Sequence, residues 1–109
     1  MAGYLPKPYS TFLDRYPDVA GAHEAVGRAV GAAGPLDLRT RHLVQLGVAV
    51  GAMSEGAVKS HARRAIEAGA GPDEVRHVVL LSLPTCGFPG VVACLGWVDE
   101  VLEARARQG

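Results

Sequence analysis

The sequence predicts an all-α protein, a small bundle of about five to six helices. Apolar residues recur at helical spacing in successive segments, and no segment alternates polar and apolar residues as a half-buried strand would. Hydrophobic residues make up 49% of the 109 residues but aromatic residues only 6%, so the core is expected to consist of Ala, Val and Leu. A short chain with this much apolar surface commonly completes its core by forming an oligomer.

The chain is expected to divide into an N-terminal arm, residues 1–17, and one helical domain, residues 18–109. Prolines limit regular structure in the arm, where Ser10–Tyr16 has room for a short helical turn. The three prolines of the arm are Pro6, Pro8 and Pro17.

Asp18 is the expected N-cap of the first full helix, and Gly34-Pro35 ends that helix. Asp37 caps a second helix over about residues 38–52. From Leu43 onward this second helix is apolar on nearly every side, which predicts a helix buried in the middle of the bundle.

Three further helices are expected over about residues 54–68, 72–83 and 89–105. Gly69 is a natural stop for the first of them, and Pro84 ends the second. The last helix carries two apolar stripes, one through Val91, Cys94, Leu95, Val98 and Leu102 and one through Trp97, Val101 and Ala104. Two stripes on one helix predict that one packs inward and the other against a partner subunit.

Charge and composition exclude several classes of protein. The formal net charge is +0 with 11 basic and 11 acidic residues and no basic stripe, which argues against nucleic-acid binding. The longest apolar run, Leu43–Met53, is too short to span a bilayer, and the N-terminus lacks the pattern of a signal peptide. Two cysteines, Cys86 and Cys94, do not make a disulfide framework, so a reduced, cytoplasmic protein without membrane contact is expected.

His61 is the residue around which any chemistry is expected to be built. On a helical wheel it lies at the margin of the packed face of the helix over residues 54–68. Its neighbours on that margin are all small: Ser54, Ala57, Ala65 and Ala68. Small neighbours leave room for another helix or for a ligand, and a histidine exchanges protons near neutral pH. The alternative is a packing histidine that bonds to a backbone carbonyl.

His42 lies near the start of the second helix, on the same stripe as Leu46, Ala49 and Met53. If the second and third helices are antiparallel, His42 and His61 come within about one helical turn of each other. A water or a substrate can then bridge the two rings. A metal site needs a third ligand, and no other side chain stands at a sequence spacing typical of metal ligands. Neither a metal nor a cofactor is therefore expected.

Four short runs carry a resemblance to a known family: Leu36–Val44, Ser54…His61-Ala62…Ala65…Gly69, Gly71–Val75 and Gly87-Phe88-Pro89. In this order and spacing, from about Leu36 to about Glu103, they resemble the carboxymuconolactone decarboxylase family, which includes the alkylhydroperoxidase D-like proteins. The resemblance implies an all-helical fold that assembles into homo-trimers or homo-hexamers.

The resemblance also implies which chemistry this chain has lost. Peroxidases of the family carry a Cys-x-x-Cys pair before the histidine, and those places hold Ser54 and Ala57 here. A glutamate of the preceding helix is replaced by His42. A dithiol peroxidase needs an attacking and a resolving thiol, so this activity is not expected.

The decarboxylase branch acts on γ-carboxymuconolactone and needs no thiol. In this hypothesis His61 is the general acid or base and His42 a second proton carrier, with Ser54, Ala57 and Phe88 beside the small-molecule substrate. In the same hypothesis Arg39 or Arg41 supplies positive charge for the carboxylates. The alternative for both, and the one that we favour, is a surface residue. Two alternatives stay open: a member that binds a ligand or partner without turnover, and a one-cysteine peroxidase that uses Cys86.

Overall fold

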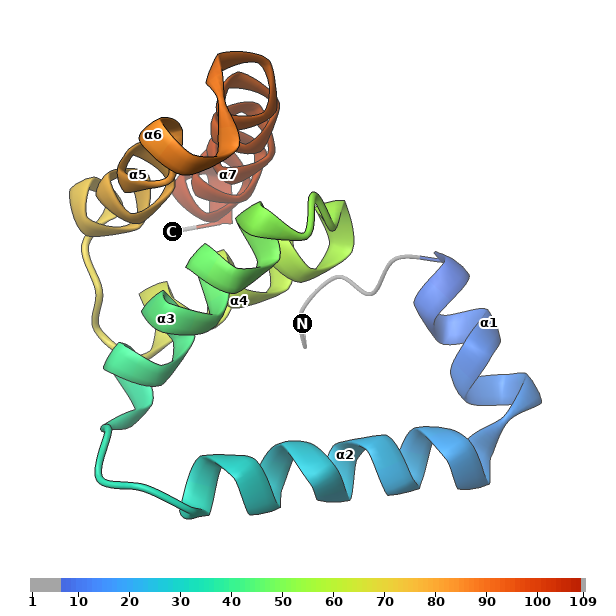
Figure 1. Cartoon of the computed structure of the whole chain (residues 1–109). Coiled ribbons are helices and arrows are strands. Elements are labelled where there is room, and N and C mark those ends of the chain that lie inside the picture. Colours follow the sequence, from blue (N-terminus) through green and yellow to red (C-terminus); the bar gives the residue numbers. More distant parts are fainter. Residues whose placement is uncertain (1–6, 109) are drawn as a thin grey trace. The chain divides into compact units, whose positions relative to one another are not determined.

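The computed structural model describes residues 7–108, which form helices and short connections without any strand (Figure 1). The predicted all-α class is therefore confirmed. The helical segments in this range are α1 (Lys7–Arg15), α2 (Pro17–Ala32), α3 (Leu38–Gly51), α4 (Glu55–Glu67), α5 (Pro72–Leu81), α6 (Leu83–Cys86) and α7 (Phe88–Gln108). α6 is a single turn.

The described residues group into two compact units, one that ends at Pro35 and contains α1 and α2, and one that begins at Leu36 and contains α3 to α7. The expected arm, residues 1–17, and domain, residues 18–109, stay a prediction. Two expectations in the first unit were wrong. Lys7–Arg15 is a helix rather than a short turn, because Pro8 falls in its first turn, where a proline is tolerated. α2 begins at Pro17, so Asp18 lies inside the first turn instead of capping it.

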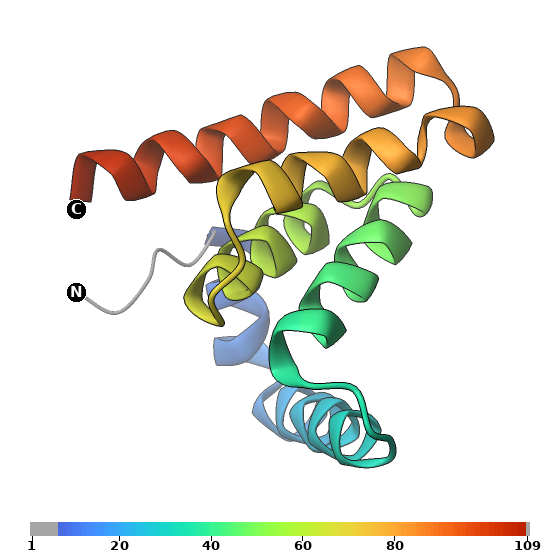
Figure 2. The same ribbon diagram turned by 90° about the vertical axis from the view of Figure 1, so that its left-hand side faces the viewer.

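The second unit is held together by a core of small and branched side chains. α4 packs against α3 and α7, and α5 packs against α7 and α3 (Figures 1 and 2). Lys59 of α4 forms an ion pair with Glu100 of α7 at 2.7 Å, which ties these two helices together at the edge of the core. The buried residues of the core are Leu46, Ala49, Val50, Val58, Ala62, Ala65, Ala70, Val75, Val79, Val91, Cys94 and Val98.

The ends of α3 and α4 follow the predicted signals, but the expectation that Pro84 ends the next helix was wrong. α5 ends at Leu81, and Pro84 lies in the first turn of α6, where a proline is tolerated. The last helix, α7, begins at Phe88 and ends at Gln108, beyond the expected 89–105. The carboxylate of Asp37 accepts the N–H of Thr40 at 2.8 Å at the start of α3. The hydroxyl of Ser54 accepts the N–H of Ala57 at 3.4 Å at the start of α4. Gly69 follows α4 with a φ of +105°, a left-handed conformation that favours glycine. Ser54 thus marks the start of α4 after the reversal, whereas Asp37 and Gly69 mark the far ends of the two helices.

Two packing expectations were wrong. α3 is not buried on all sides in the middle of the bundle, as was expected. It packs against α4 and α5, and its side chains Val44 and Val48 are 52% and 68% exposed. Trp97 and Val101 do not form a free stripe on α7, because they pack against the core of their own chain. None of the described helices is both long and apolar enough to cross a membrane.

Candidate functional site

The chain reversal between α3 and α4 brings two histidines into contact. α3 ends at Gly51 and α4 begins at Glu55, so the two helices run antiparallel side by side (Figure 1). Nδ1 of His42 lies 3.2 Å from Nδ1 of His61, and both rings are half-buried. The approach expected from counting residues back from the turn is confirmed.

The contact between the two Nδ1 atoms has a definite hydrogen-bonding requirement. One Nδ1 must carry the proton and donate, and the other must accept. Neither Nε2 atom bonds to a described residue, and neither is a buried polar atom without a partner. Both Nε2 atoms are therefore open to solvent or to a ligand.

Burial and neighbouring charges keep both rings neutral. Burial, followed by the charge of His42 and then of Arg64, lowers the pKa of His61 to about 4. Burial also lowers the pKa of His42, helped by Arg64 and Arg41 and opposed by Glu67. Desolvation and nearby cations both penalise the charged imidazolium. At neutral pH the pair is thus two neutral imidazoles joined by one N–H.

Positive charge surrounds the pair. Among residues 7–108, neither Arg41 nor Arg64 takes part in an ion pair. Nε of Arg41 is buried without a hydrogen-bond partner. A buried, unpaired guanidinium N–H is costly unless something accepts from it, and an anionic ligand would do so. These two arginines therefore favour binding of an anion, rather than a cation, beside the histidine pair.

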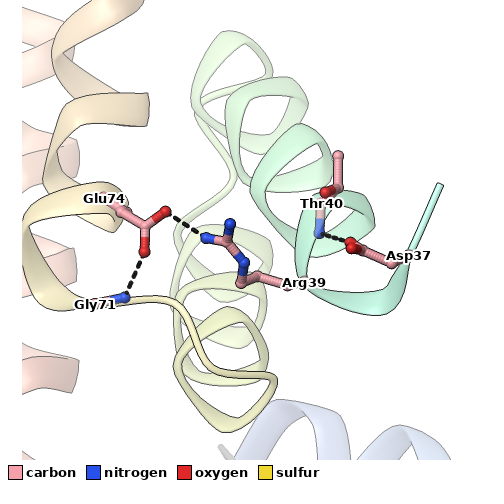
Figure 3. A network of polar contacts seen from close by, with 5 residues as sticks. All are labelled: Asp37, Arg39, Thr40, Gly71 and Glu74. Atoms are coloured by element: carbon pink, nitrogen blue, oxygen red, sulfur yellow. Dashed lines mark hydrogen bonds and ion pairs between the residues drawn. The ribbon is translucent and has the colours of Figure 1, made fainter.

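Arg39 has a different role from that of a substrate cation. It forms an ion pair with Glu74, whose other carboxylate oxygen accepts the N–H of Gly71 at 2.9 Å (Figure 3). The bond from Gly71 and the charge of Arg39 lower the pKa of Glu74. Arg39 therefore joins the start of α3 to the start of α5, one turn before His42, and is not free to bind a substrate carboxylate.

Ser54 and Ala57 occupy the two places before His61 where thiols were considered. The hydroxyl of Ser54 caps α4. Ala57 lies one turn before His61 and is half-buried against the core. Their small side chains leave space along α4 beside His61, and any role in binding stays a prediction.

Cys86 and Phe88 lie toward the opposite end of α3 from the histidine pair. The charge of Cys86 helps to raise the pKa of Cys94, after burial, and the thiol of Cys94 lies 3.9 Å from the sulfur of Met53. Met53 follows His42 by eleven residues, about 16 Å along a helix. Phe88 is 70% exposed at the start of α7. The structure thus joins two of the three expected catalytic residues, His42 and His61, and leaves Cys86 apart from them.

Arg64 is a residue of this site that the sequence reasoning missed. Its side chain is exposed on α4. The available signal was its spacing, three residues after His61, which puts its charge on the side of the helix next to that ring. No group of three His, Cys, Asp or Glu side chains is placed to hold a metal ion in the described part of the chain.

The fold and the site define a class: an all-helical protein whose two adjacent antiparallel helices carry a hydrogen-bonded histidine pair. The model of the carboxymuconolactone decarboxylase family matches residues 17–100, and the chain belongs to this family. No curated protein matches the sequence. A solved structure, that of apo-lpg0406, a carboxymuconolactone decarboxylase family protein from Legionella pneumophila, is similar with a TM-score of 0.74 and 18% identity. The similarity covers 88% of this chain and 86% of that one, and it supports the all-α fold.

Proposed function

We propose that this protein is a carboxymuconolactone decarboxylase-like lyase that acts on a small carboxylated lactone or a related small molecule. The observation that carries the proposal is the 3.2 Å contact between Nδ1 of His42 and Nδ1 of His61. It supplies two linked groups for proton transfer, and acid–base chemistry of this kind needs neither a thiol nor a metal.

The reaction places two demands on the site. When the C–CO₂⁻ bond breaks, carbon dioxide leaves and the electron pair stays on carbon, delocalised into the neighbouring carbonyl as a dienolate. That carbon must then receive a proton, and Nε2–H of His61 is the proposed donor. The carboxylates of the substrate must also be held, and Arg41 and Arg64 are the proposed cations.

Space for the substrate is proposed along α4 beside His61. Ala57, one turn before His61, offers a small side chain there, and Ser54 stands one turn further toward the start of the helix. Phe88 is proposed as an apolar contact only where the substrate reaches the exposed start of α7.

The test is carbon dioxide release from γ-carboxymuconolactone. His61→Ala is expected to lower kcat by at least a hundredfold, the usual contribution of general acid catalysis. His77→Ala is the matched control, since His77 is an exposed histidine on α5. Release that is unchanged in His61→Ala would remove His61 from the reaction.

A second candidate is a member of the family that binds an anionic small molecule without turnover. The buried, unpartnered Nε of Arg41 favours it, because a ligand acceptor would satisfy this atom whether or not chemistry follows. Carboxylated lactones that raise the melting temperature without any release of carbon dioxide would support binding alone.

We also propose that the protein forms a homo-oligomer, a trimer or a hexamer, in the cytoplasm. Exposed apolar side chains on α3, including Val44 and Val48, support the assembly, since burying them against another copy is favourable. Both cysteines are free thiols, which suits a reducing compartment.

A further inference from the structure

The arrangement of the two histidine rings decides how protons can move through them. The ring centroids lie 5.4 Å apart and the Nδ1 atoms 3.2 Å apart. The difference is close to twice the radius of an imidazole ring, so both Nδ1 atoms lie almost on the line that joins the ring centres. The Nε2 atoms therefore lie at the two outer ends of the pair and point away from each other.

This divergence excludes one way of using the pair. A small substrate cannot contact both Nε2 atoms at once, so the rings cannot act as acid and base on neighbouring atoms of one molecule. The pair can instead carry a proton from one end to the other. Each ring gains a proton at one nitrogen as it releases one from the other.

We propose that His42 and His61 form a proton wire in which Nε2 of His42 takes up a proton from water and Nε2 of His61 donates one to the substrate carbon. This inference rests on the lyase function proposed above. His61 faces the substrate because it is the more deeply buried of the two rings and has Ala57 one turn away. His42 is the less buried of the two rings and lies close to the start of α3.

The transfer balances in protons and charge. Before it, His61 carries its proton on Nε2, and His42 donates its Nδ1–H to Nδ1 of His61. As the substrate carbanion takes the Nε2 proton of His61, the shared proton crosses to Nδ1 of His61. Water then gives a proton to Nε2 of His42, and the hydroxide that remains combines with the released carbon dioxide to form bicarbonate. When the product has left, water in the open site protonates Nε2 of His61 again, the shared proton returns, and His42 releases its outer proton.

The proton wire explains how His61 can donate a proton although its low pKa keeps it neutral at pH 7. With a pKa of about 4, His61 is a cationic acid in only about one molecule in a thousand at pH 7. A neutral imidazole that donates alone would be left as an imidazolate beside a departing carbanion. Arg41 and Arg64 stabilise a transient negative charge near the rings, while Glu67 opposes it. Uptake of a proton from water by His42 moves that charge from the rings to hydroxide in the solvent, where carbon dioxide takes it up as bicarbonate.

The test separates a wire from a residue that only positions His61. In His42→Asn the side-chain amide occupies the place of Nδ1 and can still hydrogen-bond to His61, but it cannot pass a proton on. His42→Asn and His42→Ala are both expected to lower kcat for γ-carboxymuconolactone about a hundredfold with little change in KM. Added imidazole is expected to restore His42→Ala at least tenfold. Wild-type activity in His42→Asn, or no rescue by imidazole, would overturn the wire.

A second measurement needs no substrate. In wild-type protein with ¹⁵N-labelled histidine, one proton shared by the pair is expected to give a coupling between the two Nδ1 nuclei. Absence of the coupling would overturn the wire and leave a lyase that depends on His61 alone. If the coupling is present but the wild-type protein releases no carbon dioxide, the proposed lyase function fails and the donation step fails with it.

Discussion

Nδ1 of His42 and Nδ1 of His61 lie 3.2 Å apart on antiparallel helices, and this contact requires that one of the two Nδ1 atoms carries no proton. Protonation of both rings would put a proton on each Nδ1 and place two cations in contact beside Arg64. The pair is therefore a part of the fold that mild acid destabilises.

The first prediction is a loss of stability between about pH 6.5 and pH 4. The pKa of His61 is about 4 in the folded protein and near 6.5 when the chain is unfolded, and that of His42 is also lowered. Above pH 6.5 neither state binds the proton, so these groups do not affect stability. Below it the unfolded chain binds protons that the folded chain does not, so stability falls as the pH falls.

Urea unfolding at pH 7 and pH 4.5 checks this prediction. The upper limit for one group is about 1.4 kcal/mol per pH unit, and solvent around the half-exposed rings makes the effect smaller. His61→Asn is expected to lose part of this pH dependence, whereas the exposed control His77→Asn is expected to keep it. Equal slopes for wild type and His61→Asn would show that His61 titrates normally in the fold.

The second prediction concerns Arg64. Its charge lowers the pKa of both histidines, so Arg64→Ala is expected to raise both values, while Arg64→Lys should retain most of the effect. Titration of the ring signals by NMR measures the shift. On the proposed function, Arg64→Ala should also raise KM for γ-carboxymuconolactone, because it removes a cation from beside the substrate carboxylates. Unchanged pKa values would mean that Arg64 extends into solvent away from the pair.

Local signals in the sequence account for most of the second unit. Asp37, Ser54 and Gly69 each act within their own turn, so the ends of α3 and α4 could be predicted from neighbouring residues alone. The meeting of His42 with His61 followed from the same signals, because two helices that reverse at a short turn place residues at known distances from it.

Predictions that depended on contacts between distant segments were less successful. Arg39 was considered as a cation for the substrate carboxylates beside the favoured alternative of a surface residue, and Glu74, 35 residues away, forms an ion pair with it. Nothing in the local pattern around either residue shows this partner. Val44 and Val48 were expected to be buried because α3 is apolar on nearly every side from Leu43 onward, and apolarity alone does not show which side another helix covers. Only a short turn was expected over Ser10–Tyr16, because the prolines of this segment were counted without regard to the place of Pro8 in the first turn of α1.

The third prediction uses two apolar residues of α3 that differ in burial. Leu46 is fully buried, whereas Val48 is 68% exposed on the same helix. Leu46→Ala is expected to lower the free energy of unfolding by about 2–5 kcal/mol, because it removes buried methyl groups and leaves a cavity. Val48→Ala is expected to change the unfolding of the isolated chain by less than about 0.5 kcal/mol. Urea unfolding compares the two, and similar losses would contradict the assignment of the buried face.

The fourth prediction tests the proposed assembly through the exposed side of α3. Val44 and Val48 are one turn apart, so they form one apolar strip that a second copy can cover. A carboxylate buried in such an interface without a partner would be strongly unfavourable. Val48→Asp is therefore expected to shift the protein toward the monomer in light scattering at micromolar concentration, with the helical content retained. Arg28→Asp, a charged exposed position on α2, serves as the control for the added acid. A wild-type protein that is already a stable monomer would contradict the assembly. An oligomer unaffected by Val48→Asp would place its interface on another face.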